Sequence, residues 1–522
     1  MQVITVYENG TARQIEGIIG ESLHRALLAG GAEVDSPCGG NQQCGKCIVK
    51  AEGALSEMNS EERRLLGSRA DSFRLACFAT VLGDCSVTIL PKAALKVVTD
   101  YQPCDAGGET VYSEGFGAAI DIGTTTIAAY LFSPRTKGPL ASAGEYNHQQ
   151  KYGADVITRI AYSKEHGVGV LCDTILHQLS DMLKGLCREA GVSAQALRTL
   201  VITGNTTMLH FFAGLYAYPI AIAPYTPASL FGDWHPSLIP EFEHASIYLP
   251  PCISAYVGAD ITCGALASNL AERGGNWMLI DVGTNGEMML KTRNMLACCS
   301  TAAGPAFEGA GISCGSGAVP GAIDKVTLCE DKVLYSTIGG GTAKTICGSG
   351  LIDAAAVYLN LGAINRNGKL KEGKSLNIGD SRVTLTQMDI RQLQLAKSAI
   401  RAGIDTLLHE CGIEYGHLDG ILLCGGFGSY LNPCSAGTIG LIPQEWVAKT
   451  SAIGNAAGQG AAMILQSKTA LKKTHQIAEK AVTVELSTNR FFLDRFMERM
   501  AFGEEILSPG RRASKTAPDR NG

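Results

Sequence analysis

Three cysteines near the N-terminus have a spacing that suits an iron-sulfur cluster. Cys38, Cys44 and Cys47 form a C-x5-C-x2-C pattern, and Cys77 supplies a fourth thiol further along the chain. Four thiolates are the usual ligands of a [2Fe-2S] cluster. Glycines within this loop allow positive φ and let backbone amides approach the sulfurs closely. The sequence therefore predicts a [2Fe-2S] cluster bound by these four thiolates.

A structural zinc site and plain buried thiols are the alternatives for these cysteines. Structural zinc usually shows two close cysteine pairs, whereas here only Cys44 and Cys47 form one. The spacing is longer by one residue than the plant-type C-x4-C-x2-C. It resembles the adrenodoxin-type variant of the ferredoxin fold. We favour the cluster because the loop, its glycines and the distant cysteine all agree.

Two aspartate turns are the second candidate for chemistry. Asp121 opens a D-I-G-T turn after an apolar strand, and Asp281 opens a D-V-G-T turn 160 positions later (281 − 121). A repeated element indicates a duplicated unit, so we expect the two turns to face one another across a cleft. Turn amides and hydroxyls can bind phosphate oxygens, and the two carboxylates can hold a hydrated Mg²⁺.

Further glycine turns and small-residue segments accompany the two aspartate turns. A buried strand runs into Gly-Gly-Phe-Gly-Ser at 425–429, and 347–353 is another strand-to-helix turn that could lie on a nucleotide. Small residues at 256–260 and 454–458 would let two helices pack closely and pivot between lobes.

Composition excludes several classes of protein. The net charge of −5 argues against a nucleic-acid binder. Prolines interrupt the long uncharged run at 211–232, which argues against a membrane span. The N-terminus shows no signal-peptide pattern, so the 18 cysteines indicate reduced thiols and a cytoplasmic protein.

The chain divides into several expected parts, since 522 residues suffice for about three domains. In the first part we expect strands at 2–7, 13–17, 47–51 and 86–90, an Asn9-Gly10 turn, and helices at 22–29 and 60–66, the latter capped by Ser60. The parts are a ferredoxin-type β-grasp domain (1–92), a linker (93–116), ATPase subdomains I (117–275) and II (276–466), a C-terminal ATPase segment (467–507) and a disordered tail (508–522).

These segments, in this order, resemble the acetate and sugar kinase, Hsp70 and actin (ASKHA) superfamily of ATPases. With the cluster domain and the motifs at 204–208, 302–309 and 347–353, the chain resembles the reductive activators of corrinoid proteins over roughly 1–502. The resemblance implies an α/β and α+β multidomain fold, with a β-grasp domain, a linker and a duplicated actin-like (ribonuclease H-like) ATPase domain. Because the linker meets Gly117 almost directly, we expect no room for the separate middle domain of longer relatives.

The resemblance implies ATP-dependent reduction of an inactive Co(II) corrinoid to Co(I) in an anaerobic methyltransferase system. It implies a [2Fe-2S] cluster, ATP and Mg²⁺ as cofactors. The expected partners are a corrinoid protein and a low-potential electron donor, without nucleic acid or membrane, and a homodimer is left open.

The resemblance also assigns roles to individual residues. Asp121 and Asp281 would organise Mg²⁺, and Asp260 and Glu308 are the candidates to orient the attacking water. The nucleotide-binding set comprises the two aspartates with Gly123, Thr124, Thr125, Gly283, Thr284, Asn285, Gly348, Gly350, Gly425, Gly426 and Gly428. Asn147, Gln149 and the segment 153–157 resemble a family segment at the mouth of the cleft.

Three other functions stay open at this point. The chain could activate another low-potential enzyme, such as a radical or dehydratase system, although such relatives hold a [4Fe-4S] cluster between subunits. It could be an ATPase-coupled redox sensor without catalytic electron delivery. It could also be a small-metabolite kinase with a regulatory ferredoxin domain.

Overall fold

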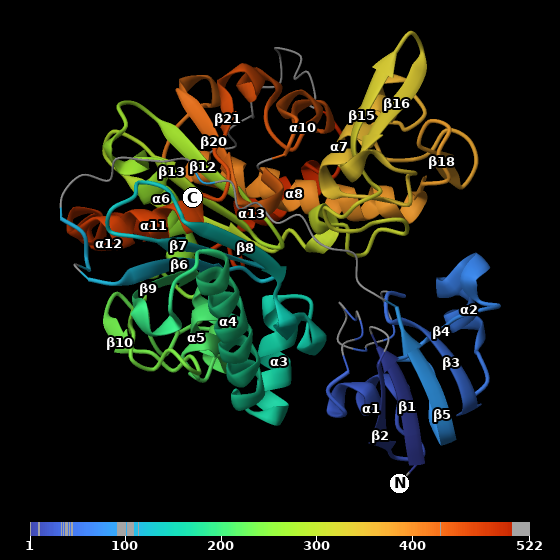
Figure 1. The fold of residues 1–522 in the computed structure, drawn as a ribbon. Helices are drawn as coiled ribbons and strands as arrows, with labels where there is room; N and C mark the ends of the chain where they lie inside the picture. The colour runs from blue at the N-terminus through green and yellow to red at the C-terminus, as the bar shows by residue number, and fades with distance from the viewer. Residues whose placement is uncertain are drawn as a thin grey trace, which may run out of the picture.

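The computed structural model describes two folded parts of the chain. It covers residues 2–8, 11–32, 34, 36, 40, 42, 45–90, 101, 109–112, 114–428 and 430–503. Figure 1 shows a small N-terminal domain, in blue, and a larger body that contains two six-stranded sheets. None of the helices in these ranges is long and apolar enough to cross a membrane.

The N-terminal domain is a five-stranded sheet in the order β2-β1-β5-β3-β4 with a helix packed on it. Its first two strands form an antiparallel hairpin, and β5 pairs parallel to β1, as a β-grasp ferredoxin fold requires. The elements are β1 (Gln2–Glu8), β2 (Thr11–Gly17), α1 (Leu23–Ala29), β3 (Ile48–Leu55), α2 (Ser60–Leu66), β4 (Arg74–Leu75) and β5 (Val81–Ile89). The Asn9-Gly10 turn lies outside the described residues.

Two details of this domain differ from the sequence prediction. Asn59 caps α2, not Ser60, because the Asn59 side chain accepts the Glu62 amide at 2.8 Å and Ser60 is already helical. Strands β3 and β5 are also longer than expected. They continue past a register shift beside Gly53, where φ is 113° and an added Cβ would lie 2.8 Å from the Asp84 carbonyl.

The first lobe of the body is built on a sheet in the order β10-β11-β9-β6-β7-β8. Apolar side chains of this sheet pack against a long helix, α4, and its neighbours in one buried cluster. The elements are β6 (Phe116–Ile122), β7 (Thr126–Phe132), β8 (Ala141–Tyr146), α3 (Val156–His166), α4 (Gly169–Glu189), β9 (Leu197–Gly204), α5 (Thr206–Phe212), β10 (Trp234–Pro236) and β11 (Ser246–Tyr248).

The second lobe has the strand order β21-β20-β12-β13-β14-β22, in which β21 to β14 repeat β11 to β8 of the first lobe and β22 is an additional edge strand. In each lobe a hairpin strand pairs parallel with a later strand, β6 with β9 and β12 with β20, and antiparallel with its hairpin partner. The strands are β12 (Trp277–Val282), β13 (Gly286–Lys291), β14 (Leu296–Thr301), β20 (Gly420–Cys424), β21 (Thr450–Ala452) and β22 (Ala481–Thr483). The predicted duplication is therefore confirmed.

Two helices rich in small residues join the lobes, as predicted. Helices α6 (Ala259–Ala267) and α11 (Ala456–Gln466) share one buried cluster with strands of both sheets. Their backbones approach so closely that a Cβ added to Gly460 would lie 2.2 Å from the Cys263 carbonyl oxygen. Glycine at this crossing is therefore a packing requirement.

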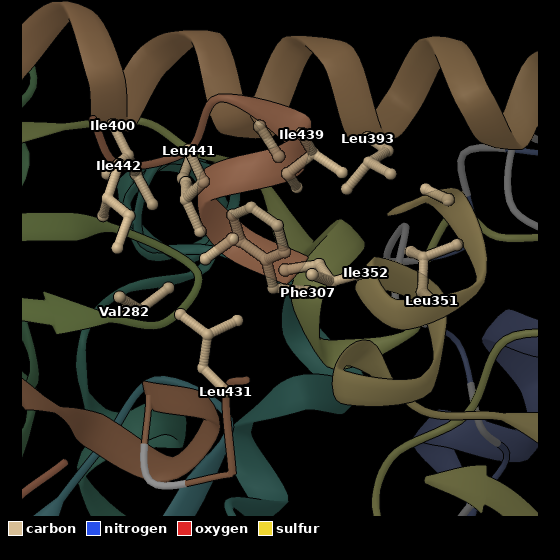
Figure 2. Close-up of a cluster of buried hydrophobic side chains, with 14 of the residues drawn as sticks. Val282, Phe307, Leu351, Ile352, Leu393, Ile400, Leu431, Ile439, Leu441 and Ile442 are labelled. Atoms are coloured by element: carbon tan, nitrogen blue, oxygen red, sulfur yellow. The ribbon is translucent and has the colours of Figure 1, made fainter. Parts of the chain in front are cut away.

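The second lobe also carries a layer that packs around Phe307. In Figure 2 this ring lies among Ile352, Ile439 and Leu441, within the largest buried cluster of the described chain. The remaining elements are β15 (Ala322–Cys329), β16 (Lys332–Thr337), β17 (Thr345–Ile346), α7 (Gly348–Asn360), β18 (Ser375–Asn377), β19 (Thr384–Thr386), α8 (Gln387–Glu410), α9 (Gly425–Gly428), α10 (Pro433–Ile439), α12 (Lys468–Lys480) and α13 (Arg490–Glu498).

The described residues of the expected linker pack on the body. Tyr101 lies edge-on to Phe132, with ring centroids 5.3 Å apart, and Tyr112 is buried in the cluster between the lobes. Glu109 forms an ion pair with Lys468 at 2.9 Å. These described residues of the expected linker therefore contact the ATPase body.

Candidate nucleotide and cluster sites

The two aspartate turns face one another, as the repeat predicted. Each turn follows the first strand of its hairpin, and the hydroxyl oxygens of Thr125 and Thr284 lie 3.1 Å apart. Both hydroxyls also donate to one carboxylate oxygen of Glu308, which Thr284 reaches at 2.8 Å. Three polar side chains from two lobes thus converge on one point.

A cleft of about 1160 Å³, part of it open to solvent, extends from this point. Most of the predicted nucleotide and water-orienting residues line it, namely Asp121, Gly123, Thr124, Thr125, Asp260, Asp281, Gly283, Thr284, Asn285, Glu308, Gly348, Gly425 and Gly426. Gly350 and Gly428 do not line it. An added Cβ on Gly350 would lie 2.2 Å from the Ile323 carbonyl, so this glycine allows α7 to pack on β15.

The Gly-Gly turn packs directly against the second aspartate. Strand β20 ends at Cys424, and Gly425 begins the short helix α9 with a φ of 88°. A Cβ on Gly425 would lie 2.2 Å from a carboxylate oxygen of Asp281. Any side chain there would displace the carboxylate, so the two motifs depend on one another.

Five carboxylates line the cleft, those of Asp121, Asp260, Asp281, Glu287 and Glu308. Burial, with the charges of Asp260 and Asp281, raises the pKa of Asp121 to about 8. Burial likewise raises the pKa of Asp281 to about 6 and holds the pKa of Glu287 well above its usual range. Mutual repulsion of this kind favours a bound cation.

The carboxylates of the cleft could bind a cation through its waters. In the described part of the chain, no three His, Cys, Asp or Glu side chains are arranged to hold a metal ion themselves. Mg²⁺ usually keeps several waters and takes one or two protein carboxylates together with substrate phosphates. The carboxylates of Asp121 and Asp281 therefore fit a hydrated Mg²⁺.

Residues behind the first turn fix its shape, and the sequence analysis assigned none of them this role. Asn147 donates to the Gly123 carbonyl at 2.9 Å, and Asn205 donates to the Thr124 hydroxyl at 3.0 Å. The buried Arg159 donates to the Thr124 carbonyl. Asn147 and Asn205 lie in segments that the sequence had singled out, whereas nothing marked Arg159.

The two candidates for orienting water occupy different surroundings. Burial raises the pKa of Glu308, and its hydrogen bonds from Thr125 and Thr284 oppose that shift. Asp260 lies in the first turn of α6 and accepts the Ile261 amide at 2.8 Å. Both line the cleft, but Glu308 is the one that already contacts both turns.

Half of the predicted cluster site lies within the described residues. The Cys47 and Cys77 sulfurs are buried and 3.2 Å apart, and the Cys77 amide donates to the Cys47 sulfur at 3.4 Å. At Gly40, φ is 83° and an added Cβ would lie 2.6 Å from the His24 ring. This pair of soft ligands fits one iron of a [2Fe-2S] cluster. Cys38 and Cys44 lie outside the described residues.

Comparison with known protein families covers almost the whole chain. The model described as 2Fe-2S iron-sulfur cluster binding domain matches residues 6–82. The model of the RACo middle region matches 116–273, and that of the C-terminal domain of RACo, the ASKHA domain, matches 275–511.

Individual relatives agree with these matches. The corrinoid activation enzyme RamQ of Eubacterium limosum is 30% identical over 78% of this chain and 73% of its own length. The [Co(II) methylated amine-specific corrinoid protein] reductase of Methanosarcina barkeri is 27% identical over 72% of this chain and 76% of its own. The solved structure of a reductive activator for corrinoid, iron-sulfur protein has 29% identity and a TM-score of 0.69, covering 96% of this chain and 98% of its own.

The match at 116–273 corrects one expectation. We expected no room for a middle domain, yet the middle region is present and is the lobe that carries Asp121. The repeat of aspartate turns had already assigned this lobe to the ATPase, so the sequence offered no separate signal for a middle region.

Proposed function

Because the chain belongs to the RACo family of corrinoid-activating proteins, we propose that it uses ATP to drive one-electron reduction of a Co(II) corrinoid to Co(I). The observation that carries this proposal is the presence, in one chain, of two facing phosphate-type turns and a close pair of ferredoxin-type thiols. The first can bind and hydrolyse a nucleotide, and the second belongs to an electron carrier.

In this proposal the cleft holds Mg-ATP. Thr125 and Thr284 donate their hydroxyls to phosphate oxygens, and the carboxylates of Asp121 and Asp281 accept from water on Mg²⁺. Gly425 and Gly426 let the backbone pass close to the ribose. Glu308, which lies between the two hydroxyls, orients the attacking water, with Asp260 as the second candidate.

The cluster supplies one electron at a time when it is bound. Cys38, Cys44, Cys47 and Cys77 would hold it, and the positive φ of Gly40 and Gly45 suits a tight loop. Plant-type clusters have potentials near about −400 mV. Co(I) is a stronger reductant than such a cluster. Each ~59 mV by which the potential of the cluster lies above that of the cobalt lowers the equilibrium constant for electron transfer about tenfold. Closure of the lobes on ATP, and removal of Co(I) by methylation, would offset the deficit.

The proposed partners follow from this chemistry. The acceptor is a corrinoid protein of a methyltransferase system, and a low-potential carrier reloads the cluster. Nucleotide state must alter affinity for the corrinoid protein, since only differential binding converts closure of the cleft into work elsewhere. We place the protein in the cytoplasm, because the cluster needs reduced thiolates.

ATP hydrolysis by the reconstituted protein tests the proposal. Purified corrinoid protein in the Co(II) state should stimulate the hydrolysis several-fold, whereas the same protein with methylated cobalt should not. A metabolite kinase would instead respond to a small phosphate acceptor, and a sensor would respond to the redox state of its own cluster. Hydrolysis that is indifferent to the corrinoid protein would contradict the proposal.

A further inference from the structure

Lys46, which directly precedes the cluster ligand Cys47, contacts the ATPase body. Its ammonium nitrogen donates to the Gly315 carbonyl at 3.0 Å and to the Ile312 carbonyl at 3.3 Å. Both contacts join the ferredoxin domain to the second lobe, beside which Figure 1 places the blue domain. The cluster loop is therefore held to the body by a charged side chain.

The acceptor carbonyls belong to a tightly built segment, 309–317, which we call the docking turn. The Ser313 amide donates to Asp389 at 2.7 Å, and the Ser316 amide donates to the Ile346 carbonyl at 2.9 Å. A Cβ on Gly315 would lie 2.1 Å from the Gly309 carbonyl oxygen. Because the Gly315 backbone packs closely against the Gly309 carbonyl, a shift at Gly309 would be passed to Gly315.

The docking turn begins where the nucleotide cleft ends. Gly309 follows Glu308, the carboxylate that holds the hydroxyls of Thr125 and Thr284. Ser316 and Gly317 line the cleft itself. A second cavity adjoins it and is lined by residues from both sides, among them Lys46, Thr125, Glu308, Gly315 and Ser316. Glu308, the docking turn and Lys46 thus connect the phosphate turns to the cluster loop.

We propose that the ferredoxin domain is bound to the docking turn when ATP is absent, and that the γ-phosphate of ATP releases the domain. This rests on the proposed function, in which the cleft takes ATP. The γ-phosphate competes for the hydroxyls of Thr125 and Thr284 and moves the Glu308 carboxylate away from them, to a position from which it still orients the attacking water. Displacement of Glu308 moves Gly309, which moves Gly315 and removes the acceptors of Lys46. ADP lacks the group that displaces Glu308 and leaves the domain docked.

Hydrogen–deuterium exchange and small-angle X-ray scattering on the cluster-loaded chain test whether the ferredoxin domain is bound to the docking turn and released by ATP. The arms are no nucleotide, ADP, and a non-hydrolysable ATP analogue, each with Mg²⁺. In the wild type, only the analogue should increase the radius of gyration and speed amide exchange in 309–317. The expected acceleration is about tenfold or more, as for loss of a charge-assisted hydrogen bond.

Lys46→Met removes the charge and keeps most of the side-chain length, so it should give the released state without nucleotide. Lys50→Met is the matched control, because Lys50 lies on β3 of the same domain, is exposed and pairs with Glu52 at 3.5 Å. The cluster absorbance of each variant shows whether its loop has assembled. The wild-type nucleotide arms remain informative if Lys46→Met does not assemble.

Identical scattering and amide exchange for the Lys46 and Lys50 variants would show that Lys46 does not hold the ferredoxin domain to the docking turn. Release by ADP as well as the analogue, or by neither while both bind, would overturn the γ-phosphate coupling. Absence of any nucleotide binding in a fluorescent-nucleotide titration would instead defeat the proposed function, and the comparison of the two lysine variants would still test the binding of the domain to the docking turn. No corrinoid protein is needed in any arm.

Discussion

Thr125 and Thr284 stand 159 positions apart in the chain and place their hydroxyl oxygens 3.1 Å from one another. Each belongs to one copy of a duplicated hairpin, and Glu308 accepts from both. The two lobes therefore meet at a polar contact that a phosphate group could enter. A ligand bound there would touch both lobes at once, which is how a nucleotide can control their closure.

Alanine at either threonine should weaken nucleotide binding. Thr125→Ala and Thr284→Ala should each raise the dissociation constant about tenfold, the cost of one hydrogen bond to a charged group. Because both side chains share Glu308, the double variant should cost less than the sum of the singles. A fluorescent-nucleotide titration measures this, with the exposed Thr136→Ala as control. Additive losses would show that the two threonines act independently.

Single substitutions should abolish ATP turnover or cluster binding without abolishing the other. Asp281→Asn removes a carboxylate from the cleft and should abolish ATP turnover while leaving the visible spectrum of the cluster intact. Cys77→Ser removes a buried thiol that we propose as a cluster ligand, and it should alter or abolish that spectrum while ATP binding persists. Absorbance after anaerobic reconstitution and a phosphate-release assay report the two properties. Loss of both properties in either variant would contradict this separation.

The twin turns were predictable because their chemistry is local. Glycine, hydroxyl and carboxylate residues at fixed spacing specify a phosphate-type turn without knowledge of distant contacts, and repetition shows that the two turns belong together. The cysteine spacing likewise identified the ferredoxin domain, and the family match at 6–82 confirms its class.

The residues that hold the first turn in shape were not predictable in the same way. Arg159 acts on Thr124 only because α3 lies behind the hairpin, and an arginine in an amphipathic helix carries no sign of that. Glu287 enters the cleft because the β12–β13 register pairs it with Asp281. The Asn59 cap was missed because two adjacent residues both favour capping, and local geometry decides between them.

Lys397 should make the stability of the ATPase body depend on pH. Burial, with the nearby charges of Arg401 and Arg499, lowers its pKa from the ordinary 10.5 to about 7. Between these values the unfolded chain binds a proton that the folded chain has released, so stability should rise with pH. The slope from this group is at most about 1.4 kcal/mol per pH unit.

Lys397→Met should reduce the increase of the unfolding free energy with pH between about pH 7.5 and 9.5. Urea unfolding followed by tryptophan fluorescence reports the body alone, because Trp234, Trp277 and Trp446 all lie within it. The exposed Lys472→Met on α12 controls for loss of a lysine. An equal slope in wild type and Lys397→Met would show that the buried amine does not titrate in this range.

Packing around Phe307 should affect both the stability of the ATPase body and nucleotide binding in the cleft. Phe307→Leu and Leu441→Ala should both destabilise the body, the latter by about 2–5 kcal/mol, because both side chains are buried in one cluster. Only Phe307 adjoins Glu308, so only Phe307→Leu should also weaken nucleotide binding. Urea unfolding and nucleotide titration measure the two effects. Weaker binding in the Leu441 variant as well would indicate a general loss of structure.

The central claim is that ATP makes the cluster of this chain an effective reductant of a Co(II) corrinoid. The direct measurement follows Co(II) and Co(I) absorbance of a corrinoid protein under anaerobic conditions, with a low-potential reductant, the reconstituted protein, and ATP present or absent. We expect Co(I) to accumulate with ATP, and to fail to do so without ATP, with the Asp281→Asn variant or with the Cys77→Ser variant. Equal formation of Co(I) with and without ATP, or none in either case, would contradict it.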